Sequence, residues 1–285
     1  MEPRIHLIKH HERMASLDGL GTHSNVRLFL RPLMIAVSNL TKEFAFSRLQ
    51  RRRGETDGVV HAVDGVSFSC TPGRIFSLIG PNGAGKTTTL RLISTILSPT
   101  SGSITVAGFD ALKQPREVKR RLGFLTGSTG LYDRLTPSEL VKYFADLNGV
   151  ESSQFKRRRD DLFTLLDMHD FANKRIGKLS TGMKQKVSIC RTMIHDPEVV
   201  VFDEPTAGLD VITAGNIIDL VRRCKQQGKT VIFSTHIMSE VELLCDDLAI
   251  MHNGKIVLSS TYDEFRSSMK TDSLTTEFIR VIEQA

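Results

Sequence analysis

Residues 75–88 read IFSLIGPNGAGKTT, and this stretch decides the fold. The apolar run Ile75–Ile79 predicts a buried strand, and it leads into a loop that fits the pattern G-x-x-x-x-G-K-[ST]. Apolar residues at helical spacing follow, which predicts a helix over 86–97. A strand, a glycine-rich loop and a helix in this order place inward-turned backbone N–H groups and a helix N-terminus around a phosphate. The residues expected to bind a nucleotide through this loop are Gly80, Pro81, Asn82, Gly83, Ala84, Gly85, Lys86, Thr87 and Thr88.

A second apolar run, Val199–Phe202, ends in two carboxylates, Asp203 and Glu204. Ligands of an open α/β sheet bind at the carboxyl ends of its strands, so these carboxylates are expected beside the phosphate loop. Mg²⁺ is expected on the Thr87 hydroxyl and, through water, on Asp203. Glu204 is expected to polarise the attacking water or take its proton.

A histidine follows a third predicted strand, Thr230–Phe233. His236 lies just past the end of that strand, level with Asp203, so we expect it to contact the γ-phosphate. Lys86 supplies a positive charge to the β- and γ-phosphates. The candidate catalytic residues are therefore Lys86, Glu204 and His236.

Composition fits a globular chain. The 285 residues carry a net charge of +6, and 40% are hydrophobic and 25% charged, which excludes wholesale disorder. The longest apolar candidate for a membrane span, Val26–Val37, is interrupted by Arg27, Arg31 and Pro32. The four cysteines lie far apart with no CxxC pair, which argues against a zinc ribbon or a disulfide scaffold and favours a reducing compartment.

Strands and helices alternate along the rest of the chain, which predicts an α/β core with a helical insert near residues 130–195. The capping pattern Thr136–Glu139 predicts a helix start, Gly149 can end that helix, and Asn253-Gly254 predicts a hairpin turn. The other expected elements are strands at 34–40, 104–106 and 122–125 and a helix over 155–168.

Six motifs in order resemble those of the ABC transporter ATPase family, over about residues 34–260. Leu179–Met183 resembles the LSGGQ signature, although Thr181 and Met183 replace its usual glycine and glutamine. Ala207–Asp210 resembles the D-loop, His236 the switch histidine, and Phe44 the aromatic residue that stacks on adenine. Other stretches are similar to the export ATPases for sodium and drugs; they are 79–85, 130–132 and 180–185.

This resemblance implies an α/β fold of the P-loop NTPase (RecA-like) type. A parallel sheet core would carry a small antiparallel β subdomain and a helical insert subdomain at about 128–195. The expected domains are an N-terminal extension, 1–33, an ATPase domain, 34–261, and a C-terminal tail, 262–285. Met34 is a candidate for the true translation start.

The resemblance also implies an ATP hydrolase that works as a head-to-tail dimer with two ATP molecules between its copies. Ser180, Gly182 and Asp210 would then bind the nucleotide held by the other copy. A separate polytopic membrane subunit would carry the cargo, with this chain on the cytoplasmic face of the cell membrane. No nucleic-acid partner is expected, because no aromatics interleave with the basic run Arg48–Gly58.

One departure concerns the loop after Leu122–Leu125, where the family usually places a glutamine that contacts the metal or the water. Gly127 aligns with that glutamine, and Ser128 is a candidate substitute.

Three alternatives stay open at this point. The chain could instead be a soluble ABC-type ATPase that acts on ribosomes or DNA. Four residues in and after the strand expected at 122–125 could dock on the membrane subunit or pack in the core; they are Phe124, Leu131, Tyr132 and Leu135. The tail, 262–285, could pack on the core or form dimer contacts.

Overall fold

The computed structural model describes residues 33–45, 58–126 and 130–285. The residues of the N-terminal extension before Leu33, nearly all of the basic run, and Gly127 and Ser128 therefore lie outside the described part. The strands are β1 (Ile35–Ala45), β2 (Val59–Cys70), β3 (Ile75–Ile79), β4 (Ser101–Val106), β5 (Phe109–Asp110), β6 (Leu122–Thr126), β7 (Val199–Asp203), β8 (Thr230–Thr235), β9 (Asp247–His252) and β10 (Lys255–Thr261). The α-helices are α2 (Lys86–Ile93), α3 (Pro115–Arg121), α4 (Pro137–Leu147), α5 (Ser152–Leu165), α6 (Thr181–Met193), α7 (Val211–Gln226), α8 (Met238–Leu244), α9 (Tyr262–Ser268) and α10 (Leu274–Glu283).

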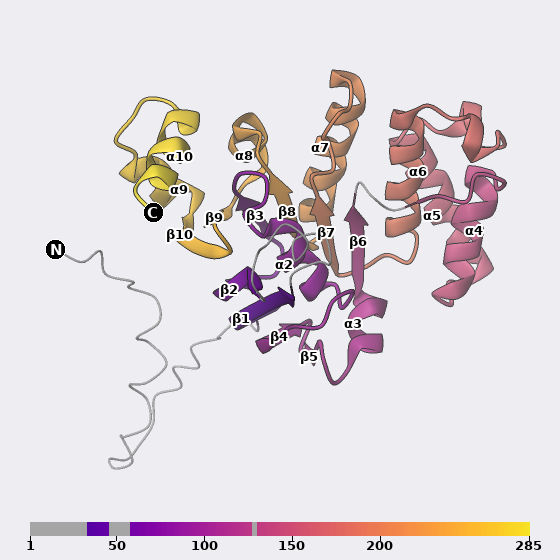
Figure 1. The fold of residues 1–285 in the computed structure, drawn as a ribbon. Helices are drawn as coiled ribbons and strands as arrows, with labels where there is room; N and C mark the ends of the chain where they lie inside the picture. The colour runs from indigo at the N-terminus through magenta and orange to yellow at the C-terminus, as the bar shows by residue number, and fades with distance from the viewer. Residues whose placement is uncertain (1–32, 46–57, 127–129) are drawn as a thin grey trace, which may run out of the picture. The chain divides into compact units, whose positions relative to one another are not determined.

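A six-stranded sheet in the order β10-β9-β3-β8-β7-β6 forms the centre of the fold (Figure 1). Its strands pair in parallel except for the β9–β10 hairpin, which turns at Asn253-Gly254 as predicted. Every residue of β3, β7 and β8 is buried, as expected for central parallel strands covered on both faces. The predicted parallel α/β core is confirmed.

Successive side chains of the central strands enter two different hydrophobic clusters, because neighbouring residues of a strand point to opposite faces. Val200 and Phe202 pack with α6 and α7. Val199 and Val201 pack with α2 and with the antiparallel sheet. The central sheet is thus the middle layer between helices on one face and α2 with the second sheet on the other.

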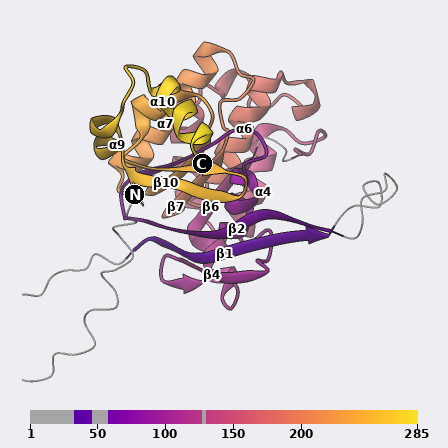
Figure 2. The same cartoon turned by 60° about the vertical axis from the view of Figure 1, so that its left-hand side comes forward.

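The second sheet has four antiparallel strands in the order β2-β1-β4-β5. Figure 2 shows β1 and β2 as a long paired ribbon, and the strands expected at 34–40 and 104–106 fall in β1 and β4. β1 pairs on both sides, with β2 and with β4. The antiparallel β subdomain expected from the family resemblance is therefore present.

Helices α4, α5 and α6 lie between β6 and β7 in the chain, where the helical insert was expected; its limits and the other domain limits stay predictions. Thr136 forms a capping box with Glu139 at the start of α4, and Gly149 follows its end with a φ of 69°. Leu131 and Leu135 pack against the core of this region and Phe124 against the other cluster. Tyr132 is 57% exposed, whereas the other three docking candidates are partly buried.

Two predicted helices end earlier than their apolar spacing suggests. α2 ends at Ile93 rather than residue 97, because Thr95 adopts a φ of 57°. α5 ends at Leu165 rather than residue 168, since Asp167 has a φ of 49°. A left-handed residue terminates a helix whatever the polarity of the side chains that follow.

The C-terminal tail packs on the core. Phe265 of α9 and Leu274 of α10 are buried with Val241 and Ile250 in a third hydrophobic cluster. Glu277 is buried beside Arg280, whose hydrogen bonds lower the pKa of that carboxyl to about 2. No helix in the described residues has the length and apolar character needed to cross a bilayer.

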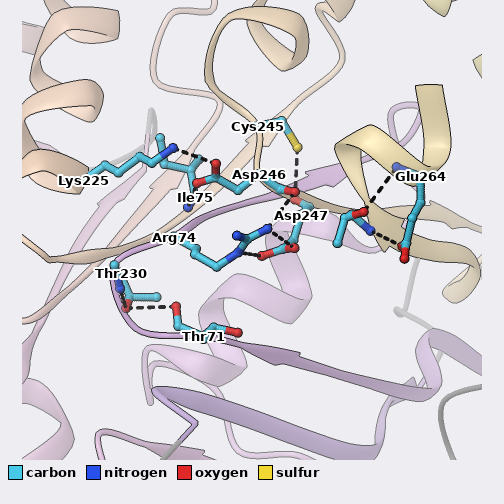
Figure 3. A network of polar contacts seen from close by, with 11 residues as sticks. Thr71, Arg74, Ile75, Lys225, Thr230, Cys245, Asp246, Asp247 and Glu264 are labelled. Atoms are coloured by element: carbon cyan, nitrogen blue, oxygen red, sulfur yellow. Dashed lines mark hydrogen bonds and ion pairs between the residues drawn. The ribbon is translucent and has the colours of Figure 1, made fainter. Parts of the chain in front are cut away.

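A polar network joins the amino ends of β3 and β9 (Figure 3). Arg74 donates two hydrogen bonds to Asp247, of 2.6 and 2.7 Å. Asp246 accepts from the Ile75 backbone N–H at 2.9 Å and from Lys225 Nζ at 2.6 Å. These contacts hold the end of the sheet that lies opposite the carboxyl ends of β3, β7 and β8.

Replacing Asp247 with alanine should destabilise the fold. The variant loses a two-point, partly buried pair with Arg74, so we expect the free energy of unfolding to fall by about 1–3 kcal/mol. The matched control is Asp64→Ala, which removes a surface pair with Lys255 and should cost less than about 1 kcal/mol. Urea unfolding measures the free energy of unfolding of both variants. An equal decrease in the two would show that the Arg74–Asp247 pair stabilises the fold no more than a surface ion pair does.

Candidate active site

The loop after β3 wraps tightly against neighbouring backbone. A Cβ on Gly80 would lie 2.4 Å from the Met251 carbonyl oxygen, and a Cβ on Gly85 would lie 2.4 Å from that of Ala62. Gly85 also has a φ of 104°, which side chains rarely adopt. It precedes α2, whose N-terminus has no side-chain cap and no acidic residue in its first turn. That helix end is therefore suited to an anion.

Lys86 is only 4% exposed, and its ammonium group is held inside the loop. Its Nζ donates to the carbonyl oxygens of Gly80 at 2.7 Å and Pro81 at 3.1 Å, and it lies 3.3 Å from Glu204 Oε1. A buried ammonium is stable only with such partners. The structure thus brings Lys86 and Glu204, which are far apart in the sequence, into one ion pair.

Asp203 ends β7 and accepts two hydrogen bonds on the same oxygen. Thr87 Oγ1 donates to Asp203 Oδ1 at 3.0 Å, and Ser234 Oγ donates to it at 2.8 Å. Ser234 is the partner of Asp203 in the register between β7 and β8. The two residues expected to hold a metal are therefore in direct contact.

Glu204 follows directly, with a φ of 48°. A positive φ is uncommon outside glycine, and this one is held by the Glu204 N–H, which donates to both the carbonyl and the hydroxyl of Ser234. The side chain turns so that Oε1 lies 3.3 Å from His236 Nδ1, which is half exposed. The three candidate catalytic residues, Lys86, Glu204 and His236, consequently meet at one carboxylate.

Two adjoining clefts open at this edge of the sheet, and Thr87 and Glu204 border both. The first has a volume of about 420 Å³ and is lined mainly by residues 82–88, with His61 and Asn253. The second, of about 330 Å³, is bordered by Asp203, Thr126 and Gln185 among others.

The signature residues line a different cleft of about 540 Å³. Ser180 caps α6, where its hydroxyl accepts from the Met183 N–H at 3.3 Å, and Gly182 follows in the first turn. Asp210 caps α7 by accepting from the Thr213 N–H at 2.9 Å, a bond that lowers the pKa of this carboxyl. Ser180, Gly182 and Asp210 are thus brought together, but Lys86 does not border their cleft.

Gly80, Pro81 and His236 are expected site residues that border none of these three clefts, and neither does Phe44. Its ring is 41% exposed, and Lys42 Nζ lies 5.1 Å from the ring centre. Its partner across the β1–β2 pairing, Val60, does line the first cleft.

The sequence patterns did not mark Ser234, His61 or Asn253 as residues of this edge. Ser234 could have been found by aligning the ends of the two predicted strands, since it pairs with Asp203. His61 and Asn253 reach the first cleft from the antiparallel sheet and from the β9–β10 turn. No local pattern marks His61, and the pattern Asn253-Gly254 predicts a turn without placing it at the cleft.

A glycine loop that leads into a buried lysine, beside two carboxylates and a histidine from the ends of neighbouring apolar strands, defines a nucleotide-hydrolysing P-loop protein. The family model described as ABC transporter matches residues 63–207. The chain is 43% identical to the ABC transporter ATP-binding protein NatA of Bacillus subtilis (strain 168), over 79% of this chain and 92% of that protein. It is 34% identical to the linearmycin resistance ATP-binding protein LnrL of the same organism, over 74% of this chain and 68% of that protein.

A solved structure agrees with these relatives. The ATP-binding subunit of an ABC transporter matches with a TM-score of 0.76 at 27% identity, covering 87% of this chain and 99% of that one. The chain belongs to the ABC transporter family, as an ATP-binding subunit that hydrolyses ATP.

Gly85→Ala should be more damaging to the fold than Gly83→Ala. Both positions have positive φ, so both variants carry about 1 kcal/mol of backbone strain. Only at Gly85 does the new Cβ also meet a backbone oxygen, since nothing lies within 4 Å of a Cβ on Gly83. Urea unfolding without nucleotide should rank Gly85→Ala clearly below Gly83→Ala, and equal stability would contradict the close approach to Ala62.

Proposed function

We propose that this chain is the nucleotide-binding subunit of an export transporter, and that it hydrolyses ATP with the residues gathered at the carboxyl ends of β3, β7 and β8. The observation that carries the proposal is the meeting of Lys86, Glu204 and His236 within 3.3 Å contacts beside the glycine loop. Glu204 and His236 directly follow β7 and β8, and Lys86 follows β3 across the glycine loop; together they offer a cation, a base and a second polar contact for one phosphate.

The triphosphate would lie along the glycine loop. Backbone N–H groups of the loop and the uncapped start of α2 would bind its oxygens, and Lys86 Nζ would bind the β- and γ-phosphates. The loop residues proposed for this contact are Gly80, Pro81, Asn82, Gly83, Ala84, Gly85, Lys86, Thr87 and Thr88. Phe44 is proposed to stack on adenine, which requires its exposed ring to turn toward the cleft beside Val60.

Mg²⁺ is proposed to bind at Thr87 and Asp203. Their hydroxyl and carboxylate oxygens lie 3.0 Å apart, and oxygen ligands are those that Mg²⁺ prefers. The described residues include no cluster of three His, Cys, Asp or Glu side chains able to hold a metal, which suits a cation bound largely by substrate phosphates. Mg²⁺ would supply neutralisation of charge on those phosphates.

Glu204 is the proposed general base. Its carboxylate borders both clefts and is oriented from two sides by Lys86 and His236. From there it can take a proton from a water aligned with the γ-phosphate. His236 would contact that phosphate and hold the carboxylate in place.

The site is proposed to be complete only in a head-to-tail homodimer. Ser180 and Gly182 start α6 and offer a hydroxyl and an N–H to an anion, yet Lys86 of the same chain lines another cleft. A γ-phosphate bound to a second copy would meet that need, with Asp210 at the same interface. ATP would then join the two copies and hydrolysis would release them.

A separate polytopic membrane subunit is proposed to carry the cargo, with this chain on the cytoplasmic face of the membrane. The exposed ring of Tyr132 would form part of the contact. It packs edge to face on Tyr143, with the two ring centroids 6.4 Å apart. Export is supported by the relatives, of which LnrL is named for linearmycin resistance. Sodium and drugs are the cargo classes that the family resemblance suggests.

Lys86→Ala should lose nucleotide binding. Removing charge-assisted bonds to phosphate should raise the ATP dissociation constant by at least about tenfold. Lys119→Ala, on the exposed face of α3, is the matched control and should bind as the parent does. Titration with a fluorescent ATP analogue measures the dissociation constants of both variants. If Lys86→Ala bound ATP as tightly as the parent, Lys86 would not be part of the nucleotide site.

Glu204→Gln should bind ATP but hydrolyse it at least about 100-fold more slowly, because an amide cannot act as a base. It should therefore accumulate as an ATP-bound dimer, detected by gel filtration with light scattering. Glu151→Gln, at an exposed position, is the control. Unchanged turnover would reject Glu204 as the base, and a monomer in ATP and Mg²⁺ would reject the dimer.

The transporter assignment itself is tested by purifying Glu204→Gln from native membranes in ATP and identifying its partners by mass spectrometry. A polytopic membrane protein that is retained by Glu204→Gln and lost with Lys86→Ala is the expected result. Recovery of soluble partners alone, such as ribosomal proteins, would overturn the transporter role and leave the ATPase site untouched.

A further inference from the structure

A buried carboxylate outside the residues described so far joins two loops of the active site. Glu240 lies in α8 and is 5% exposed. Its Oε1 accepts a hydrogen bond from Thr206 Oγ1 at 2.5 Å, and its Oε2 accepts one from Thr235 Oγ1 at 2.6 Å. Each oxygen of one carboxylate thus holds a hydroxyl from a different segment of the chain.

The two threonines are next to the proposed catalytic pair. Thr235 is the last residue of β8 and directly precedes His236, whereas Thr206 follows Glu204 by two positions. Both threonine side chains are buried. Thr235 Oγ1 also accepts from the Ile237 N–H at 3.0 Å, so one hydroxyl fixes the backbone on both sides of His236.

A second connection between the same two loops is made within the central sheet, by Ser234 of β8. Ser234 binds the Asp203 carboxylate through its hydroxyl and the Glu204 N–H through both of its oxygens. Ser234 therefore fixes the start of the Glu204 segment, and Glu240 fixes its continuation at Thr206. Between these two attachments the Glu204 side chain meets His236 at 3.3 Å.

Stability alone gives a weak reason for a carboxylate at this place. Taking a charge out of water is unfavourable, and apolar residues of similar size often stabilise a buried site at least as well. A carboxylate with two oriented oxygens instead fixes the separation between two hydroxyls, which an apolar side chain cannot do. A catalytic constellation needs its groups held in place by such supporting hydrogen bonds.

We propose that Glu240 is a positioning residue for ATP hydrolysis, which sets His236 relative to Glu204 by tying Thr235 to Thr206. The proposal rests on the roles proposed above for Glu204 and His236. Glu240 touches neither cleft and would act only through these two threonines.

The first test separates turnover from binding. Glu240→Ala should lower kcat by about 10- to 100-fold, the effect of a small misplacement of reacting groups, while KM for ATP stays within about twofold. Glu240→Gln should restore most of the activity, because an amide keeps one acceptor and adds a donor to which a threonine hydroxyl can turn. Glu242→Ala, on the exposed face of the same helix, is the control and should match the parent.

A double variant tests the route and does not depend on Glu240→Ala alone. Thr235→Val removes the hydroxyl beside His236 with little change in shape and should also lower kcat at constant KM. If Glu240 acts through Thr235, adding Glu240→Ala to Thr235→Val should lower kcat far less than it does in the parent. If Glu240→Ala does not fold, Thr206→Val takes its place in the same comparison.

Three results would overturn the proposal: parent-like kcat in Glu240→Ala, a rise in KM with kcat unchanged, or full additivity with Thr235→Val. Glu240→Gln as inactive as Glu240→Ala would also count against it. His236→Ala distinguishes a failure of the proposed role of His236 from a failure of the positioning role of Glu240. If His236→Ala keeps the parent's kcat, the proposed role of His236 fails; if it loses activity and Glu240→Ala does not, only the positioning role fails.

Discussion

The register of three parallel strands is the constraint on which the rest of the structure depends. Ile79 at the end of β3 pairs with Thr235 of β8, and Asp203 at the end of β7 pairs with Ser234. Three loops must therefore leave the sheet at one edge, whatever their distance in the sequence. Because helices and a second sheet cover both faces of these strands, polar groups can concentrate only where the strands end.

Gathering charged groups at this edge has an electrostatic cost, because Lys86 and Asp203 are buried. Hydrogen bonds and an ion pair within the site offset that cost. Lys86 is nearly buried, so its charge needs the two loop carbonyls and Glu204 around it. Asp203 is similarly held by the hydroxyls of Thr87 and Ser234. Groups fixed in this way need little reorganisation when charge develops on a substrate, and poor access of water strengthens their effect.

Short apolar runs followed by polar residues were enough to predict β3, β7 and β8, and hence the meeting of Lys86 with the carboxylates. The predicted C-terminal ends of α2 and α5 were wrong, because Thr95 and Asp167 adopt left-handed backbone conformations. The apolar spacing from which these ends were predicted does not indicate that conformation. The positions of His61 and Asn253 at the first cleft could not be foreseen, since they depend on how the antiparallel sheet and the β9–β10 turn pack beside the glycine loop. Local patterns predict what a segment forms, whereas packing decides which distant segment borders its cleft.

The segment from Glu204 to Asp210 connects the chemistry to the proposed dimer contact. Glu204 borders the two clefts beside the glycine loop, and Asp210 borders the cleft of Ser180 and Gly182. Leu209, one residue before Asp210, lines both the signature cleft and the one beside Asp203. A segment this short, held at Thr206 by Glu240, has little freedom to absorb a displacement at one end. Docking of a second copy at Asp210 would therefore displace Glu204 as well, and in the proposed dimer this stretch of chain would link dimer formation to hydrolysis.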